Sequence, residues 1–208
     1  MFKWQAIKQH FKEMRTYIGV SIVLFLAGTF VGATDHSFAS FLDGQLAGLE
    51  QLSDAISQSK NVALVSFLII FLNNAVKAVI TIYLGAFFAW FPISFLTING
   101  MVLGYMFQKI AEEKSMSVAF EVYAKGILPH GWIEIPVIIV AAAYGVRFGV
   151  LMMQLVIHSI FSRSKLKQTL NNLRYFLIRS VPVAILVVVF LLIAAIIEST
   201  LTPLILSI

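Results

Sequence analysis

His130 and Glu134 are the two side chains in this sequence whose types and spacing point most directly to chemistry. They stand four positions apart, so in a helix they share one face. Pro129 suits the first turn of that helix, where free N–H groups attract negative charge. Such a pair can orient a metal ion, work as an acid–base couple, or bind a polar group such as a lipid headgroup. It is equally typical of a structural polar lock that ties membrane helices together.

A metal site is the weakest of these interpretations. The sequence contains no His-Glu-x-x-His motif, and Glu198 is the one obvious further ligand. No Gly-x-Ser-x-Gly motif of a serine hydrolase stands at a strand-to-helix turn. We therefore assign no metal, no cofactor and no catalytic residue from the sequence.

The other polar side chains within apolar stretches are few. Together with the pair above they make a candidate intramembrane polar site: Asn73, Asn74, Asn99, His130, Glu134, Arg147 and Glu198. A polar group in lipid is costly unless it finds a partner, so we expect these residues to meet. A rise of about 1.5 Å per residue places all of them except Arg147 in the middle or outer half of the membrane. Arg147 and Lys77 fall in the inner half, where long side chains reach the cytoplasmic headgroups.

The surrounding sequence is that of an integral membrane protein. Of its 208 residues 60% are hydrophobic, 12% are charged and none is cysteine, and the mean hydropathy is +0.92. A water-soluble domain carries about twice that share of charge, which excludes an ordinary soluble enzyme. The absence of cysteine excludes disulfides, thiolate zinc sites and iron–sulfur centres. The net charge of +5 suits lipid headgroups and not nucleic acid, because the basic residues are sorted by side of the membrane.

Five stretches are apolar and long enough to cross the bilayer, which takes about 20 residues. They are Tyr17–Ala33, Val62–Tyr83, Ala86–Phe107, Gly131–Phe148 and Val181–Ser199. The fourth belongs to a longer apolar run, Ile127–Phe161, which as one helix would measure roughly 52 Å against a hydrocarbon core of about 30 Å. We expect this helix to continue into the cytoplasm; the alternative is a hairpin near Gly145–Gly149, with six crossings. The sequence thus predicts an all-α polytopic transmembrane bundle that forms a single membrane domain, residues 1–208.

Charged residues outside the crossings predict the orientation. Residues 1–16 and 162–179 are strongly basic, whereas 34–60 and 108–126 are acidic or balanced. Because Lys and Arg collect on the cytoplasmic side, we expect the N-terminus inside. Residues 1–16 are predicted to form an amphipathic helix on the inner headgroups, and 34–60 an outer amphipathic segment. The start of the chain also has features of a signal peptide, but the long, patterned segment before the apolar run favours an uncleaved first crossing.

Three pairs of glycines are spaced four residues apart within, or directly at the end of, the predicted crossings. They are Gly28 with Gly32, Gly100 with Gly104, and Gly145 with Gly149. Small residues at this spacing let membrane helices pack closely. We expect a compact bundle, in which these faces serve contacts within one chain or between copies in a homo-oligomer.

Several short elements follow one another in the chain: Asn73-Asn74, Asn99-Gly100 with Gly104, Leu128-Pro129-His130-Gly131 with Glu134, Gly145-Val146-Arg147-Phe148-Gly149, and Glu198 with Thr202-Pro203. From about residue 60 to the C-terminus they resemble the stage II sporulation protein M family of multi-pass bacterial and archaeal membrane proteins. The resemblance implies a place in the prokaryotic cytoplasmic membrane. It also implies a namesake that acts during engulfment as the membrane partner of peptidoglycan-degrading proteins.

Three functional hypotheses follow, in this order. The first is a non-enzymatic scaffold for other envelope membrane proteins or peptidoglycan-remodelling proteins, since the outer segments are too short for a hydrolase domain. The second is a transporter or lipid-handling protein whose outer-half polar cavity binds a headgroup or a small solute. The third is an intramembrane hydrolase that uses His130 and Glu134. The lipid bilayer is a partner in all three.

Overall fold

The computed structural model describes residues 4–206 of the chain, and the side chains of residues 9–205. Within this range the chain forms helices and no strand, which confirms the all-α prediction. The helices are α1 (Trp4–Thr34), α2 (Ala39–Ser57), α3 (Val62–Leu84), α4 (Trp90–Glu113), α5 (Met116–Val122), α6 (Leu128–Phe161), α7 (Arg163–Ile196) and α8 (Thr202–Leu206). A 3-10 turn lies at His36–Phe38, and π-helical turns lie at Tyr123–Ile127 and Ile197–Leu201.

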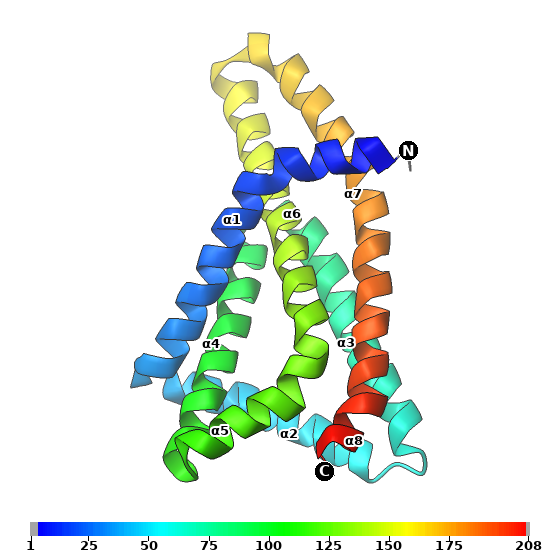
Figure 1. The fold of residues 1–208 in the computed structure, drawn as a ribbon. Coiled ribbons are helices and arrows are strands. Elements are labelled where there is room, and N and C mark those ends of the chain that lie inside the picture. The colour runs from blue at the N-terminus through cyan, green and yellow to red at the C-terminus, as the bar shows by residue number, and fades with distance from the viewer. Residues whose placement is uncertain (1–3, 207–208) are drawn as a thin grey trace.

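Five helical stretches of the described residues are long and apolar enough to span a membrane, as predicted. They are Gln9–Thr34, Val62–Leu84, Trp90–Glu113, Met116–Phe161 and Arg163–Ile205. Helix α6 runs unbroken for 34 residues, so the alternative hairpin near Gly145–Gly149 is wrong. The chain turns instead at Ser162, and α7 follows directly. Figure 1 shows α6 and α7 projecting together beyond the other helices, as expected for a helix longer than the bilayer is thick.

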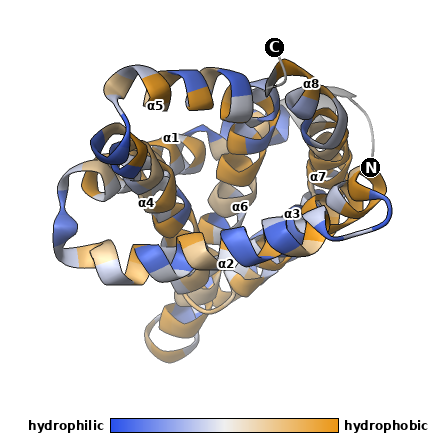
Figure 2. Cartoon of the chain, turned by 90° about the horizontal axis from the view of Figure 1, so that it is seen from below, coloured by the Kyte–Doolittle hydropathy of each residue, from blue (hydrophilic) through white to orange (hydrophobic). Residues whose placement is uncertain are grey.

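The bundle has two distinct ends (Figure 1). The α6–α7 hairpin, with Arg163, Lys165 and Lys167, and the first part of α1 lie at one end, which we term the basic end. Helices α2, α5 and α8 lie at the other, which we term the α2 end. Figure 2 looks onto the α2 end and shows α2 along one side of it, with α5 and α8 along the other. The long helices α1, α3, α4, α6 and α7 run between the two ends.

The first part of α1 crosses the bundle at the basic end before the helix turns along α4 (Figure 1). Of the predicted amphipathic segment, residues 1–3 lie outside the described residues. The ring centroids of Phe11 and Tyr144 are 6.4 Å apart, and Met14 is fully buried. This segment therefore packs apolar side chains onto the bundle core, where Tyr144 and Phe176 are also fully buried.

The start of the third crossing differs from the prediction. Helix α4 begins at Trp90, four residues after the predicted start at Ala86, because the chain makes a tight turn between α3 and α4. In this turn Phe88 and Ala89 have φ angles of 54° and 65°, in the left-handed region that disfavours side chains. Their apolar side chains continue the hydropathy of the helix, so hydropathy alone gives no sign of the turn.

The predicted glycine pairs are used for close packing within the chain. A Cβ atom on Gly32 of α1 would lie 2.0 Å from the carbonyl oxygen of Met101, and one on Gly104 of α4 would lie 1.9 Å from that of Thr29. Helices α1 and α4 thus touch along their backbones, as small residues permit. In the third pair, in α6, Gly145 packs against Thr81 of α3 and Pro92 of α4. Gly149 packs against the turn between these helices, where a Cβ on Gly149 would lie 2.1 Å from the nitrogen of Ala89.

Candidate functional site

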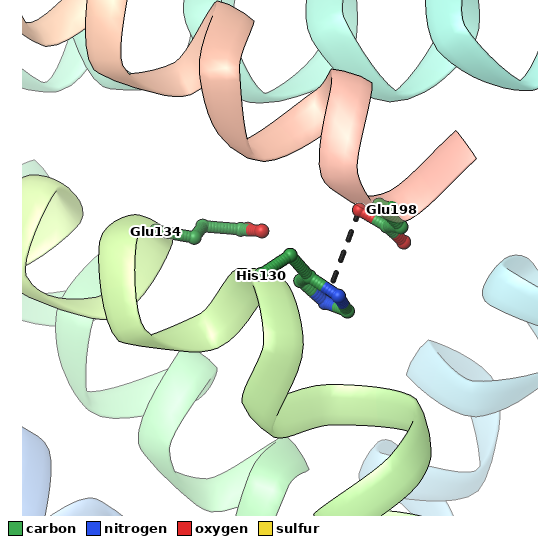
Figure 3. A group of neighbouring side chains, drawn as sticks. All are labelled: His130, Glu134 and Glu198. Atoms are coloured by element: carbon green, nitrogen blue, oxygen red, sulfur yellow. Dashed lines mark ion pairs between the residues drawn. The ribbon is translucent and has the colours of Figure 1, made fainter. Parts of the chain in front are cut away.

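Five of the predicted site residues lie together at the α2 end and line one cavity of about 490 Å³. They are Asn73 and Asn74 of α3, His130 and Glu134 of α6, and Glu198 of the π-helical turn after α7. We refer to these five residues as the polar cluster. Figure 3 shows the side chains of His130, Glu134 and Glu198 directed toward the same space between α6 and the end of α7.

Hydrogen bonds connect part of the polar cluster. Asn74 Nδ2 donates to Glu134 Oε1 at 3.0 Å, and Asn73 Nδ2 donates to Asn74 Oδ1 at 3.3 Å. His130 Nε2 lies 3.9 Å from Glu198 Oε2 (Figure 3). One nitrogen of His130 and one carboxylate oxygen each of Glu134 and Glu198 lie within 4.8 Å of one another. The three side chains can therefore act on a single bound group.

The polar cluster is only partly satisfied by its own contacts. His130 Nδ1 is buried and has no hydrogen-bond partner among the described residues. Among the ion pairs of the described residues, Glu198 pairs with His130 alone and Glu134 takes part in none. The side chains of His130 and Glu198 are 13% and 28% exposed. Buried polar groups are normally hydrogen-bonded, so the polar cluster keeps unused hydrogen-bonding capacity.

Two π-helical turns help to position the cluster. His130 comes three residues after the turn Tyr123–Ile127, and Glu198 lies inside the turn Ile197–Leu201. The Tyr123 hydroxyl donates to the carbonyl oxygen of Leu103 and so ties the first of these turns to α4. A π-helical turn adds one residue to a helical turn and thereby changes the direction of the side chains that follow. Hydrophobic periodicity does not reveal such turns, so sequence analysis missed them.

The residues of α2 and α8 that close the cavity were not predicted from the sequence. Helix α2 contributes Leu49, Leu52, Ser53 and Ile56 to its lining, and Thr202 joins them from α8. The sequence predicts that the segment 34–60 is amphipathic, but not which surface its apolar side chains contact. The spacing of apolar residues in this segment thus indicates that one side of the helix is covered. It does not indicate that the covered side faces the cavity.

Two predicted site residues lie away from the polar cluster. Asn99 Nδ2 donates to Phe95 O of its own helix at 2.7 Å, and Asn99 lines a different cavity together with Gln45 and Lys77. Arg147 lies toward the basic end.

Arg147 joins three helices there. Its Nη2 atom is 3.8 Å from Glu13 Oε2, and its Nη1 atom is 3.3 Å from Met14 Sδ. Its guanidinium carbon lies 5.7 Å from the ring centroid of Phe176. Arg147 therefore ties α6 to α1 and α7 and has no contact with the cavity at the α2 end.

An exposed ion pair holds α2, and with it the cover of the cavity, to α4. Asp43 Oδ1 accepts from Lys109 Nζ at 2.7 Å and from Tyr105 Oη at 3.0 Å. These hydrogen bonds lower the pKa of Asp43 below its ordinary value, and the one from Lys109 has the larger effect. A lowered pKa in the folded state means that the pair stabilises the docking of α2 at neutral pH. This contribution is lost as the pH falls below about 3.9 and through the lowered pKa.

We expect Asp43→Asn to loosen α2 at neutral pH, and acid to do the same to the wild-type chain. The chain contains no cysteine, so cysteines introduced at Gln51 and Glu113 carry two spin labels with no competing thiol. The distance distribution between the labels should be narrow at pH 7 and broaden either in Asp43→Asn or progressively as the pH falls below about 3.9. Asp54→Asn, in the same helix, is the control and should leave the distribution narrow at pH 7. Equal distributions for Asp43→Asn and the wild type at pH 7 would contradict the prediction.

Five helices long and apolar enough to cross a membrane define a polytopic α-helical membrane protein, and the polar cavity between them is its candidate site. The chain belongs to the stage II sporulation protein M family, whose family model, Stage II sporulation protein M, matches residues 21–203. This confirms the family indicated by the sequence motifs. An uncharacterized protein of Methanocaldococcus jannaschii is 28% identical over 135 residues, which cover 65% of this chain and 55% of that relative. The chain thus spans about half the length of this curated relative. No solved structure matches the chain.

Proposed function

We propose that this protein binds the headgroup of a lipid, or a small solute of the same chemistry, in the cavity at the α2 end, as a lipid-handling protein or transporter does. The observation that supports this most strongly is a cavity of about 490 Å³ lined by the polar cluster inside an apolar bundle. A structural lock would be closely packed and fully hydrogen-bonded. Here the cluster lines a cavity, and one nitrogen of His130 lacks a hydrogen-bond partner among the described residues. Ionisable groups of this kind within a membrane typically mark binding sites and transport pathways.

The lining of the cavity favours a ligand that carries positive charge or N–H and O–H donors. The cavity has two carboxylates, from Glu134 and Glu198, and no Lys or Arg among its described lining residues. An anionic group placed here would be repelled by the carboxylates, whereas an ammonium group would be attracted to them. Among common headgroups, phosphatidylethanolamine carries an ammonium group, whereas phosphatidylglycerol offers hydroxyl donors only and has a net negative charge. The carboxylates should therefore favour phosphatidylethanolamine.

We propose that the protein lies in the cytoplasmic membrane of a prokaryote, with its N-terminus inside. The basic residues of the α6–α7 hairpin support this orientation, because Lys and Arg collect on the cytoplasmic side. The α2 end and its cavity then lie in the outer half of the membrane. A ligand would accordingly come from the outer leaflet or from outside the cell.

Lipid selectivity tests the proposed function. The protein, stripped of metals with EDTA, is placed in nanodiscs of equal parts phosphatidylethanolamine and phosphatidylglycerol, and retained lipid is measured by native mass spectrometry. We expect about a tenfold preference for phosphatidylethanolamine, equivalent to about 1.4 kcal/mol, which is lost in the double variant Glu134→Gln/Glu198→Gln. If free ethanolamine displaces phosphatidylethanolamine, the small solute is the better ligand. If it does not, the lipid is the better ligand.

The control variant for this experiment is Glu121→Gln. Glu121 lies at the same end of the bundle but forms an exposed pair with Lys125, at 3.0 Å. This variant should keep the wild-type selectivity. Equal retention of the two lipids by the wild-type protein would overturn the proposed function.

The second candidate function is the scaffold, and membership of the stage II sporulation protein M family is the observation that favours it. In this case the protein positions other envelope or peptidoglycan-remodelling proteins, and the polar cluster holds its own helices together. Glu134→Gln would then be tolerated in cells whenever the protein folds. Under the first proposal the same variant folds but loses its function.

A further inference from the structure

We propose that His130, Glu134 and Glu198 bind one divalent transition-metal ion within the cavity at the α2 end. This inference rests on the part of the proposed function that gives the cavity a preference for positive charge, and it names a metal ion as a second source of that charge. Among the described residues, these three form the one group of three His or carboxylate side chains with ligand atoms this close together. They come from two separate parts of the chain, α6 and the π-helical turn after α7.

The spacing of the ligand atoms fits an ion after small side-chain rotations. The three atoms lie within 4.8 Å of one another. Zinc binds imidazole nitrogen and carboxylate oxygen at about 2.0–2.2 Å, so two ligands of one ion stand at most about 4.4 Å apart. The side chains of His130 and Glu134 leave neighbouring turns of one helical face, and Figure 3 shows Glu198 facing them from across the gap.

The charge of the site also favours a cation. Two ionised carboxylates and a neutral imidazole carry a charge of minus two, and the described ion pairs offer them no Lys or Arg. Leaving this charge uncompensated inside a membrane is very unfavourable. One divalent ion neutralises it completely. Protons could also neutralise it, and the experiment below separates these two cases.

The ligand types select the class of metal. Imidazole is a ligand for zinc, copper, iron and nickel, whereas calcium and magnesium prefer oxygen ligands. The amide of Asn74 supports the site from outside, because its hydrogen bond of 3.0 Å fixes the direction of the Glu134 carboxylate. Three protein ligands leave a coordination position open, and the cavity of about 490 Å³ leaves room for a further molecule there.

Zinc titration of the full chain tests this proposal. The untagged protein is stripped with EDTA, transferred to buffer without chelator and titrated with ZnCl₂ by calorimetry. We expect one zinc ion per chain, with affinity reduced more than about 100-fold in His130→Ala and in Glu198→Gln, and about 10–100-fold in Asn74→Ala. The absence of cysteine from the chain removes the commonest competing ligand. Cobalt in place of zinc should give the visible absorption bands of a four-coordinate site, and these bands should disappear in His130→Ala.

The control is His36→Ala, which removes an exposed histidine at the same end of the bundle. It should bind zinc as the wild type does. The proposal is wrong if the folded wild-type protein binds no stoichiometric zinc, as expected when protons neutralise the carboxylates. It is also wrong if zinc binding survives in both His130→Ala and Glu198→Gln.

The lipid experiment distinguishes this proposal from the proposed function. Selectivity for phosphatidylethanolamine in EDTA, combined with no zinc binding, would overturn the metal site alone. Stoichiometric zinc binding without lipid selectivity in EDTA would support the metal site and overturn the lipid proposal. If both are right, adding zinc should weaken the preference for phosphatidylethanolamine, because the ion neutralises the carboxylates that cause it.

Discussion

Replacing Asn74 with leucine is expected to lower the free energy of unfolding by about 2–3 kcal/mol. Asn74 donates to the carboxylate of Glu134 and accepts from Asn73, so its loss breaks two hydrogen bonds. It also leaves a carboxylate within the membrane with no hydrogen bond among those described. Unsatisfied buried groups cost more than the hydrogen bond itself contributes, and charged groups cost the most. Reversible unfolding in mixed micelles, in the presence of EDTA, measures the change.

Asn73→Leu is the matched control for this variant. Asn73 is the neighbouring asparagine and lines the same cavity, but its described hydrogen bond goes to the neutral amide of Asn74. Its loss should cost about 1 kcal/mol, which is the usual value for a bond between neutral groups. Similar losses of stability in the two variants would contradict the role assigned to Asn74.

The double variant Asn74→Leu/Glu134→Leu gives a second, independent outcome. Replacing both partners with apolar side chains removes the unsatisfied carboxylate, and such replacements are nearly neutral in stability. The double variant should therefore be more stable than Asn74→Leu alone, with a coupling energy of about 1–3 kcal/mol. Additive effects of the two substitutions would show that the hydrogen bond between Asn74 and Glu134 contributes nothing.

The number of crossings could be predicted from the sequence because each crossing must satisfy its own backbone polar groups within lipid. What hydropathy could not predict is the route of the chain between crossings. Ala86, Phe87 and Phe88 are as apolar as any helix interior, yet they form a turn with left-handed backbone at Phe88 and Ala89. Similarly, the amphipathic pattern of the segment 34–60 predicts a surface helix but does not predict whether lipid or protein covers its apolar side.

The candidate site is predicted from the depth of each residue in the membrane. Depth alone does not predict which residues make contact. It places Asn73, Asn74, His130, Glu134 and Glu198 in the middle or outer half of the membrane, and the structure brings these five together. Asn99 has a comparable predicted depth but faces another cavity, because depth does not specify which side of a helix a residue occupies. The contacts of Arg147 with Glu13 and Met14 depend on the first part of α1 crossing the bundle. No spacing in the sequence gives that crossing.

The packing of α6 against the turn between α3 and α4 should be the point most sensitive to added volume. Gly149→Ala is expected to lower the free energy of unfolding by about 3 kcal/mol or more. A Cβ on Gly149 would lie 2.1 Å from the nitrogen and 2.6 Å from the Cα of Ala89. These are backbone atoms of a tight turn, so no side-chain rotation can relieve the contact, and α6 must move away from α3 and α4. Unfolding in mixed micelles measures this loss.

Gly131→Ala is the matched control, because Gly131 is also a buried glycine of α6. Its added Cβ would meet only side-chain atoms of Ile127 and Ile135, at 3.5 Å and 3.6 Å. These are ordinary contacts, and alanine favours a helix over glycine by up to about 1 kcal/mol, so this variant should be neutral or slightly more stable. Ala89→Gly should relieve the left-handed strain of the turn but should not rescue Gly149→Ala, because the two closest contacts are with backbone that glycine retains. Rescue by Ala89→Gly would mean that the Ala89 side chain, and not the backbone of the turn, limits the approach of α6.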